Sequence, residues 1–397
     1  MIGISKLYLG QVEPSDALRY GRRSADLPSH LLQFSADKKP VVVWNVTSRC
    51  NLTCEHCYAA TGKCHDVREL DTTEAKTLLD DLAAFGCPVA LFSGGEPLLR
   101  HDLPELVAHA VSRGLRAVVS SNGTLLDDAM ARRLKDAGTT YVGISVDGKP
   151  ESHDRFRGMP GAFARTLAGI RACKAAGLKV GLRHTITADT ADDIPTIFDL
   201  LEAEDIPRVC FYHLVYTGRA AELRTRDLSH DATRRIVDLI IDRTADLARR
   251  GLRKEVLTVD NHCDGPYLYM RMLREGNTAG AARVLELLRM NGGNSTGQGI
   301  SSIGWDGDVY PDQFWRTQCL GNVRERPFST IWVDPKNELL GELRNKKAHV
   351  TGRCKGCRFL DVCGGNFRAR AEAATGTRWG VDPACYLTDA EIAQTQP

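Results

Sequence analysis

The feature that most constrains the fold is an alternation of short apolar runs with helical patterns between residues 41 and 212. The runs have the length and composition of buried strands, and they are Val41–Trp44, Pro88–Phe92, Ala117–Ser120, Tyr141–Ser145, Val180–Thr187 and Val209–Tyr212. The helical patterns between them are Thr72–Phe85, Leu103–Arg113, Asp127–Ala137, Ala162–Ala176 and Ile194–Ala203. Because helices separate successive strands, the pattern predicts an α/β fold with a parallel sheet and helices packed outside it. The periodicity leaves open whether the sheet closes into a barrel.

The composition is that of a globular protein of 397 residues, with 43% hydrophobic and 26% charged residues. This length predicts one large domain and a smaller one. The net charge of +2 gives no indication of a nucleic-acid-binding surface. No apolar stretch resembles a signal peptide or is long enough to cross a membrane. We therefore expect a cytoplasmic protein with no nucleic-acid or membrane partner.

Three cysteines follow the first predicted strand closely, at Cys50, Cys54 and Cys57. Their C-x3-C-x2-C spacing places three thiolates on one tight loop, which suits an iron–sulfur cluster with one iron left open. A structural zinc site is the alternative, but such sites have four closed ligands and commonly use C-x2-C pairs. The chain has thirteen cysteines, and in the reducing cytosol these do not form a disulfide framework.

A second group of cysteines lies near the C-terminus, at Cys354, Cys357, Cys363 and Cys385. Four thiolates close either a zinc site or a [4Fe–4S] cluster, and the spacing alone allows both. The cysteine-rich tail has little hydrophobic periodicity, so we expect a metal centre to order it. Upstream of the tail, Ser301–Trp305 and Asp308–Pro311 flank the dipeptide Asp306-Gly307, which predicts a β-hairpin.

The first three cysteines, with the aromatic His56 before the last of them, resemble the signature loop of the radical S-adenosylmethionine (radical SAM) superfamily. The resemblance implies a [4Fe–4S] cluster whose open iron is chelated by SAM, and a 5'-deoxyadenosyl radical that abstracts hydrogen from a substrate. It also implies a partial (β/α)6 TIM-type barrel. The run Gly94-Gly95-Glu96-Pro97 ends the second predicted strand and resembles the GGEP motif that binds the SAM amino group. Taken alone, this run would be an ordinary strand-to-helix turn.

Polar residues also end the next predicted strands, where parallel sheets bind ligands. Asn122 follows the third strand, Ser145 and Asp147 belong to the end of the fourth, and Arg183 lies on the fifth. The first three residues are equally compatible with turns, and Arg183 with a surface ion pair. The resemblance implies that the first three contact the methionine or ribose part of SAM and that Arg183 pairs with its carboxylate. The superfamily's glycine-rich fifth-strand motif is not clearly present.

The C-terminal cysteines resemble the SPASM-type extension of radical SAM enzymes, which carries auxiliary iron–sulfur clusters. This sequence has Phe367 where a further cysteine is expected, and its upstream half offers only Cys319. The resemblance thus implies one auxiliary [4Fe–4S] cluster, with Cys319 as an uncertain ligand. The predicted divisions are an N-terminal extension (1–40), a radical SAM core barrel (41–225), a helical connector with the substrate-pocket region (226–300) and the auxiliary-cluster domain (301–397).

Four short runs resemble the tetrapyrrole-modifying group of the superfamily, and they are Met1–Tyr8, Leu27–Phe34, Asn291–Ser295 and Asp312–Trp315. That group acts in sirohaem-dependent haem biosynthesis and in haem d1 biosynthesis. The N-terminal run is most similar to the branch that removes the C2 and C7 acetate side chains of 12,18-didecarboxysirohaem to give iron-coproporphyrin III. The resemblance implies an iron-tetrapyrrole substrate, an electron donor such as ferredoxin or flavodoxin, and a monomer.

The candidate substrate residues are His262, Asn294 and Arg316. Arginines near the expected mouth of the sheet are candidate partners for the substrate carboxylates, and they are Arg183, Arg219, Arg271 and Arg316. Three alternatives remain at this stage. The chain is compatible with a haem d1 enzyme that removes propionates from the same precursor, with a SPASM peptide maturase, and with a zinc-stapled binding protein without catalysis.

Overall fold

The computed structural model describes residues 1–11, 39–61 and 68–393. Within these residues the centre of the fold is one sheet of eleven strands, in the order β1-β8-β7-β6-β5-β4-β3-β2-β9-β10-β11. The strands are β1 (Ile2–Gly3), β2 (Val41–Asn45), β3 (Val89–Ser93), β4 (Arg116–Ser121), β5 (Tyr141–Ser145), β6 (Val180–Ile186), β7 (Arg208–His213), β8 (Glu255–Val259), β9 (Ile300–Ile303), β10 (Asp308–Tyr310) and β11 (Gly321–Asn322).

Most of this sheet is parallel. Neighbouring strands run parallel from β8 through β7 to β2 and on to β9. The antiparallel pairs β1–β8, β9–β10 and β10–β11 lie at the two ends. Because β1 and β11 are the two edges of the strand order, the sheet is open. The structure thus confirms the α/β fold with a parallel, incompletely closed sheet.

Two parallel strands lie beyond the six that the sequence pattern predicts. β8 pairs with β7 in the register Arg208 to Glu255, and β9 pairs with β2 in the register Val41 to Ile300. The sheet therefore continues past residue 225, the predicted end of the barrel. The region 226–300 contributes a strand as well as the expected helices.

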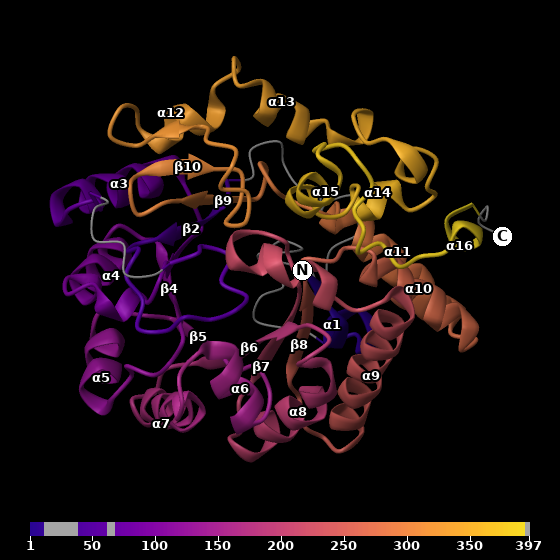
Figure 1. Cartoon of the computed structure of the whole chain (residues 1–397), viewed down its shortest axis with the longest axis horizontal. Coiled ribbons are helices and arrows are strands. Elements are labelled where there is room, and N and C mark those ends of the chain that lie inside the picture. Colours follow the sequence, from indigo (N-terminus) through magenta and orange to yellow (C-terminus); the bar gives the residue numbers. More distant parts are fainter. Residues whose placement is uncertain (12–38, 62–67, 394–397) are drawn as a thin grey trace.

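The helices α3 to α9 alternate with the parallel strands and lie around the outside of the sheet (Figure 1). The α-helices are α1 (Ile4–Leu9), α3 (Thr72–Phe85), α4 (Leu103–Ser112), α5 (Asp128–Asp136), α6 (Pro150–Arg157), α7 (Ala162–Ala175), α8 (Ile194–Ala203), α9 (His230–Arg249), α10 (Asp264–Arg274), α11 (Thr278–Asn291), α12 (Phe328–Val333), α13 (Glu338–Arg344), α14 (Leu360–Cys363), α15 (Arg368–Thr375) and α16 (Asp389–Ala393). Short 3-10 helices are η2 (Pro97–Leu99), η3 (Ala191–Asp193), η4 (Gly218–Arg226), η5 (Lys346–Ala348) and η6 (Gly352–Cys354).

Local sequence signals set the ends of these helices. In α3 the Asp71 carboxylate accepts hydrogen bonds from the amides of Thr73 and Glu74, each at 2.9 Å, and the Glu74 carboxylate accepts one from the Asp71 amide at 3.0 Å. This capping box satisfies amides that the first helical turn leaves unpaired. The helix ends at Gly86, whose φ of +87° suits a residue without a β-carbon.

Side chains alternate between the two faces of the parallel strands, as expected for a period of two. On β3, Ala90 and Phe92 are buried in the hydrophobic core under the helices, whereas Val89 and Leu91 face an internal cavity. The neighbouring strands repeat this pattern. The helix-facing side of the sheet therefore supplies the core, and the other side lines the cavity.

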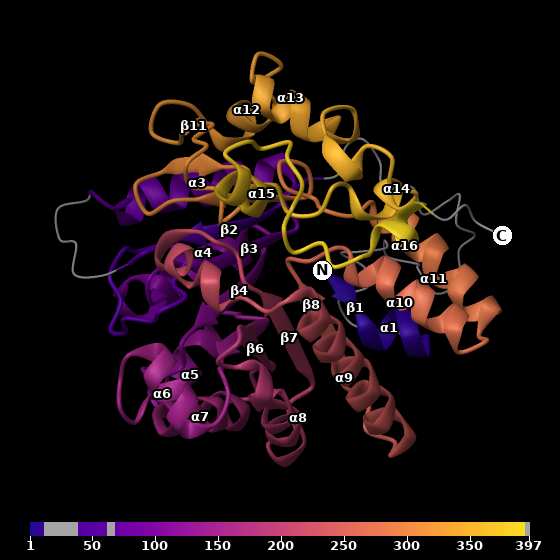
Figure 2. The ribbon, with the colours of Figure 1, turned by 45° about the vertical axis from the view of Figure 1, so that its right-hand side comes forward.

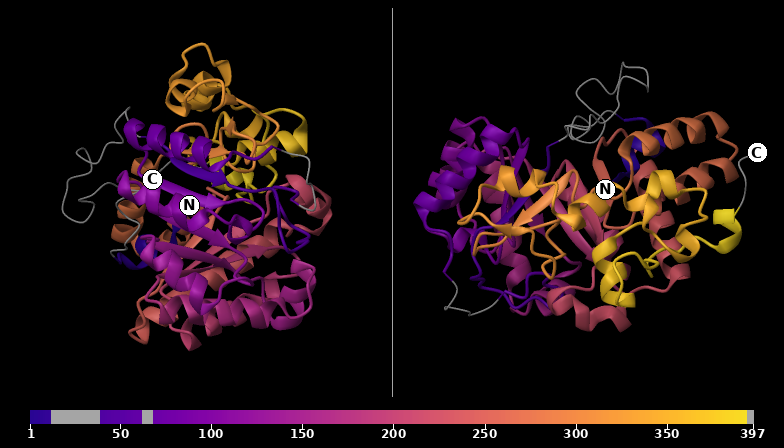
Figure 3. Two further views of the ribbon diagram at one scale, coloured as in Figure 1. Left: turned by 90° about the vertical axis from the view of Figure 1, so that its left-hand side faces the viewer. Right: turned by 90° about the horizontal axis from the view of Figure 1, so that it is seen from above.

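The C-terminal segment from β9 onward packs along one side of the sheet (Figures 2 and 3). β9 and β10 form the predicted hairpin, and Gly307 in its turn has a φ of +91°. At one end of the segment α12 contacts α3, and at the other α14 contacts α10 and α11. The segment thus spans the barrel rather than forming a separate body.

The N-terminal residues pack against the β8 edge of the sheet. Ile2 pairs with Thr258, and the Ser5 hydroxyl accepts a hydrogen bond from the Val256 amide at 2.9 Å. The run Leu27–Phe34, one of the four that resemble the tetrapyrrole-modifying group, lies outside the described residues. Among the helices that the structure describes, none combines the length and the apolar character needed to span a bilayer.

Candidate functional site: an internal cavity between two cysteine clusters

The three N-terminal cysteines lie on the loop that follows β2 and face a cavity of roughly 1450 Å³ inside the open sheet. The Cys50 sulfur accepts a hydrogen bond from the Leu52 amide at 3.4 Å, and the Cys57 sulfur lies 3.5 Å from the Thr61 hydroxyl. Burial raises the pKa of Cys50 to about 12. Thiolates at such a site require a cationic partner, and bound iron meets that requirement.

The run Gly94-Gly95-Glu96, at the end of β3, packs against the loop that carries the three cysteines. The Gly95 amide donates to the Thr47 carbonyl and the Glu96 amide donates to the Arg49 carbonyl, both at 2.8 Å. A β-carbon on Gly95 would lie 2.0 Å from the Arg49 carbonyl oxygen, and one on Gly94 would lie 2.6 Å from the Thr47 oxygen. Both glycines also line the cavity. Their small size is therefore needed for packing against the cysteine loop as well as for any approach of a ligand.

Glu96, in contrast, is fully buried behind the cavity wall and does not line it. Its carboxylate accepts hydrogen bonds from the Ser121 hydroxyl and the Asn122 amide, both at 2.8 Å. Burial raises the pKa of Glu96 to about 7. In this arrangement Glu96 joins the end of β3 to the end of β4, and the backbone of its motif is what faces the cavity.

The polar residues at the next strand ends fall into two groups. Asn122, Ser145 and Arg183 line the cavity, whereas Asp147 is fully buried outside it. The Asn122 amide group donates to the Asn51 side chain at 2.9 Å, so it also steadies the cysteine loop. Arg183 lies across Gly143 and donates to the Ser120 hydroxyl.

Asp147 has a role that the sequence did not indicate, because it pairs with Arg157 at the end of α6. The Arg157 guanidinium also lies 3.7 Å from the Cys54 sulfur. Burial raises the pKa of Cys54, and the Arg157 charge opposes that shift. His56 stacks on Phe156 with ring centroids 4.3 Å apart, which fixes the loop from the same helix. No sequence motif marked Arg157, because its partners come from elements far apart in the chain.

The four C-terminal cysteines lie within electrostatic range of one another. Cys354, Cys357 and Cys385 each raise the pKa of Cys363 electrostatically, in addition to its burial. Two buried basic side chains, Lys346 and Arg368, also lie within electrostatic range of Cys363. The Lys346 Nζ has no hydrogen-bond partner among the described residues, and burial lowers its pKa to about 7. Buried positive charge around four thiols fits an anionic iron–sulfur centre.

Two other cysteines lie near the C-terminal segment. Cys319, the uncertain ligand, is exposed beside the β9–β10 hairpin, where its sulfur lies 3.6 Å from the Gly321 carbonyl. Cys263 is buried next to Cys385 and helps lower the Cys385 pKa to about 7. The Cys263 thiol therefore contacts the C-terminal group at Cys385, which the linear spacing did not reveal.

Neither group of cysteines has the geometry of a single-ion site. Among residues 1–11, 39–61 and 68–393, no three His, Cys, Asp or Glu side chains converge closely enough to hold one metal ion. Thiolates that ligate a cluster stand around a larger body, so they lie farther apart than around zinc.

Of the three predicted substrate residues, two line the cavity and one does not. His262 and Asn294 line the cavity, and the Asn294 amide donates to the Cys363 carbonyl at 3.2 Å, which joins the cavity to the C-terminal cysteines. Arg316 does not line the cavity, because its guanidinium stacks on Trp305, 4.1 Å from the ring centroid. Arg219 lines the cavity but donates to the Cys54 and Thr61 carbonyls of the cysteine loop.

Arg271, the remaining arginine candidate, is on the outer surface. It forms ion pairs with two carboxylates of α9, Asp238 and Asp242, and with Glu275, the residue after α10. It is therefore not a cavity residue. Of the four arginines, Arg183 and Arg219 reach the cavity.

The arrangement matches known families at both ends. Residues 44–201 match the radical SAM superfamily, and residues 295–358 match the iron–sulfur cluster-binding SPASM domain. The solved structure of native anSMEcpe with bound AdoMet shares the fold with a TM-score of 0.66 and 19% identity, over 87% of this chain and 94% of that one. Streptococcus suis SuiB bound to S-adenosylmethionine does so with a TM-score of 0.70 and 17% identity, over 88% and 78%. The fold and site define a radical SAM enzyme with a SPASM domain, which uses SAM, a [4Fe–4S] cluster and auxiliary iron–sulfur chemistry.

Curated relatives narrow this class. Fe-coproporphyrin III synthase of Methanosarcina barkeri is 61% identical over 99% of both chains. Pre-heme d1 synthase of Dinoroseobacter shibae is 41% identical over 89% of this chain and 87% of its own length. AdoMet-dependent heme synthase of Nitratidesulfovibrio vulgaris is 34% identical over 87% and 91%. The chain belongs to the tetrapyrrole-modifying family of radical SAM enzymes that these relatives represent.

Proposed function

We propose that this enzyme makes iron-coproporphyrin III by removing the C2 and C7 acetate side chains of 12,18-didecarboxysirohaem in sirohaem-dependent haem biosynthesis. The observation that carries the proposal is the 61% identity to Fe-coproporphyrin III synthase over 99% of both chains. The cavity of roughly 1450 Å³ supports it, because it exceeds the ~300–1,000 Å³ of an ordinary small-molecule pocket and has room for SAM and a tetrapyrrole together.

The cysteine loop after β2 is the proposed site of the SAM-binding [4Fe–4S] cluster, held by Cys50, Cys54 and Cys57. When bound, the cluster and SAM supply the 5'-deoxyadenosyl radical that starts the loss of each acetate. The backbone of Gly94 and Gly95 faces SAM from the end of β3. Further SAM contacts come from Asn122, Ser145 and Arg183, whereas Asp147 acts through Arg157.

Arg157 has a defined part in this arrangement. Its charge lies 3.7 Å from the Cys54 sulfur and is balanced by the buried Asp147 carboxylate. A fixed cation beside a ligating thiolate stabilises the anionic form and holds its orientation. Arg157 is thus a positioning residue for the cluster loop.

The C-terminal cysteines are the proposed ligands of one auxiliary [4Fe–4S] cluster, and they are Cys354, Cys357, Cys363 and Cys385. Lys346 and Arg368 balance its charge from the buried side. The same proposal includes a reductant such as ferredoxin or flavodoxin, a cytoplasmic location and a monomeric enzyme. It keeps the predicted division into extension, core barrel, connector and auxiliary-cluster domain, with β8 as a connector strand that joins the barrel sheet.

The test is an anaerobic reaction of the reconstituted enzyme with SAM, reductant and 12,18-didecarboxysirohaem, followed by mass analysis of the tetrapyrrole. Loss of two acetate equivalents is the expected result. Loss of propionates would assign the enzyme to the haem d1 branch instead, and an unchanged pigment beside active SAM cleavage would reject both. Cys54→Ala should abolish SAM cleavage, whereas the surface variant Asp136→Asn should leave it unchanged, because Asp136 is exposed on α5.

A further inference from the structure

Asp260 is a buried acid at the C-terminal end of β8 that no step above uses. It lines the cavity, its residue is only 7% exposed, and its Oδ2 has no hydrogen-bond partner among the described residues. A buried carboxylate without a partner is costly, so proteins keep such a group neutral or give it a ligand.

The backbone of Asp260 has a strained conformation that orients its carboxyl group. Its φ of +65° lies in the left-handed region that residues other than glycine seldom adopt. Such strain persists where surrounding contacts enforce it, and these positions cluster at functional sites. Here the conformation directs the carboxyl into the cavity.

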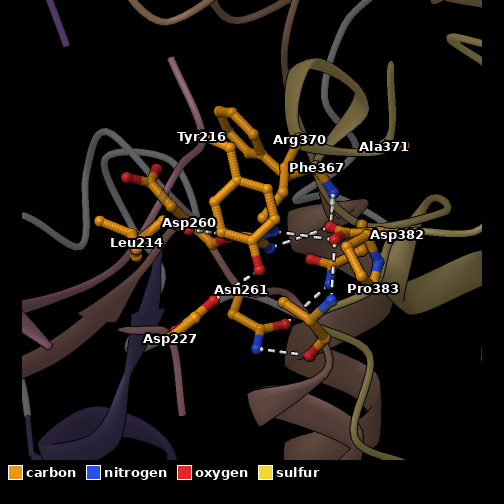
Figure 4. Close-up of polar contacts among 12 residues, drawn as sticks. Leu214, Tyr216, Asp227, Asp260, Asn261, Phe367, Arg370, Ala371, Asp382 and Pro383 are labelled. Atoms are coloured by element: carbon orange, nitrogen blue, oxygen red, sulfur yellow. Dashed lines mark hydrogen bonds and ion pairs between the residues drawn. The ribbon is translucent and has the colours of Figure 1, made fainter. Parts of the chain in front are cut away.

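Arg370 of α15, in the C-terminal segment, makes the contact that holds the Asp260 backbone in this conformation. Its guanidinium donates to the Asp260 carbonyl at 2.8 Å and to the Leu214 carbonyl at 2.9 Å, which joins the ends of β8 and β7. It is held from behind by a bidentate pair with Asp382, at 2.8 and 2.9 Å. Figure 4 shows this network, with the Asp260 carboxyl turned away from Arg370 and Asp382.

The charged groups that face Asp260 do not neutralise it. The N-terminal ammonium of Met1, Arg370 and His213 favour its ionised form, and Asp312 of the segment after β10 opposes it. Burial outweighs them and raises the pKa of Asp260 to about 7. Arg370 is already committed to Asp382 and two backbone carbonyls, so it makes no direct ion pair with the Asp260 side chain.

We propose that the Asp260 carboxyl donates a hydrogen bond to a carboxylate arm of the iron-tetrapyrrole, and that the Arg370–Asp382 pair positions it. The inference rests on the proposed function, since it needs a polycarboxylate ligand in the cavity. A protonated carboxyl binds a carboxylate, whereas an ionised one repels it. Asp260 would therefore make tetrapyrrole binding depend on pH.

The experiment measures tetrapyrrole affinity by absorption titration of the anaerobic, cluster-reconstituted enzyme between pH 6 and 8.5, without turnover. Two probes are used, 12,18-didecarboxysirohaem and its product iron-coproporphyrin III. For wild-type enzyme we expect Kd to rise as pH passes about 7, by up to tenfold for each unit above it, as Asp260 ionises. The carboxylates of the probes stay ionised throughout this range.

Three variants separately test the hydrogen bond from Asp260, its ionisation and its positioning by Arg370. Asp260→Asn keeps a donor and cannot ionise, so its Kd should not change with pH. Asp260→Ala should bind roughly 10- to 100-fold more weakly at pH 6, because a hydrogen bond to a charged group is lost. Asp382→Asn, which loosens Arg370, should weaken binding at pH 6 in the same direction. Asp136→Asn on the outer face of α5 is the matched control and should behave as wild type.

A pH effect with both probes assigns the contact to a propionate, and an effect with 12,18-didecarboxysirohaem alone assigns it to an acetate. If the wild type binds both probes and Asp260→Ala binds them equally well with the same pH profile, the role of Asp260 is refuted while the proposed function stands. If the wild type binds neither probe, both are refuted. Iron content and circular dichroism of each variant show whether its clusters and fold are intact.

Discussion

The buried ion pair between Arg157 and Asp147 allows a prediction in which the effect on folding stability can be separated from the effect on SAM cleavage. Replacing Arg157 with Met removes the partner of a carboxylate that is fully buried. Breaking a buried pair in this way costs ~3–5 kcal/mol, because an unpaired charge remains inside the protein. Unfolding entropy of about 2.1 cal/mol/K per residue over 397 residues is about 0.8 kcal/mol/K, so we expect the melting temperature to fall by about 4–6 °C.

A second substitution tests this reasoning. Arg157→Met with Asp147→Asn removes both charges, so the double variant should regain much of the lost stability in a thermal melt. It should not regain SAM cleavage, because the cation beside the Cys54 sulfur is still missing. A single variant as stable as the wild type would refute the energetic argument. A double variant with normal SAM cleavage would refute the role of Arg157 at the cysteine loop.

Three further predictions follow from single contacts. Gly95→Ala should lower iron incorporation at the SAM-binding cluster, because its β-carbon would lie 2.0 Å from the Arg49 carbonyl oxygen, whereas Gly341→Ala, with open space around it, should not. Asp260→Asn should raise the melting temperature at pH 8 more than at pH 5. The pKa of Asp260 is about 4 in the unfolded chain and about 7 in the folded protein, so its ionisation lowers folding stability increasingly between these two pH values. Above pH 7 this loss of stability stays constant. An equal effect at both pH values would contradict this. Lys346→Met should shift the reduction potential of the auxiliary cluster downward in a redox titration followed by electron paramagnetic resonance, because a buried positive charge stabilises the reduced form; an unchanged potential would exclude Lys346 as a charge partner.

The sequence predicted most of the parallel sheet because the strands β2 to β7 are short apolar runs, and helices with clear ends separate them. Tyr141–Ser145 is a strand with the predicted bounds, and Thr72–Phe85 a helix with the predicted bounds. β8 was missed because Glu255–Val259 lies between long helical patterns and has no glycine motif after it. Its place in the sheet is decided by pairing with β7, which is a tertiary contact.

In the candidate site, too, residues close in sequence could be predicted, whereas residues brought together by tertiary contacts could not. Cysteines could be grouped from spacing because ligands of one cluster tend to lie close in sequence, as Cys354 and Cys357 do. Cys263 could not be added to its group, since 122 residues separate it from Cys385. Asp260 and Arg370 illustrate the limit most clearly. Neither stands in a recognisable motif, and their significance depends on a backbone conformation and a hydrogen bond across 110 residues.

The pairing of β9 with β2 has a consequence for the order in which the enzyme is made. β2 leads into the loop of the radical cluster, yet its second neighbour in the sheet, Ile300–Ile303, leaves the ribosome only after three quarters of the chain. Until then Val41–Asn45 is an edge strand with unpaired backbone groups, a state that favours aggregation. Synthesis of the roughly 250 residues between β2 and β9 therefore sets how long β2 remains an open edge of the growing sheet.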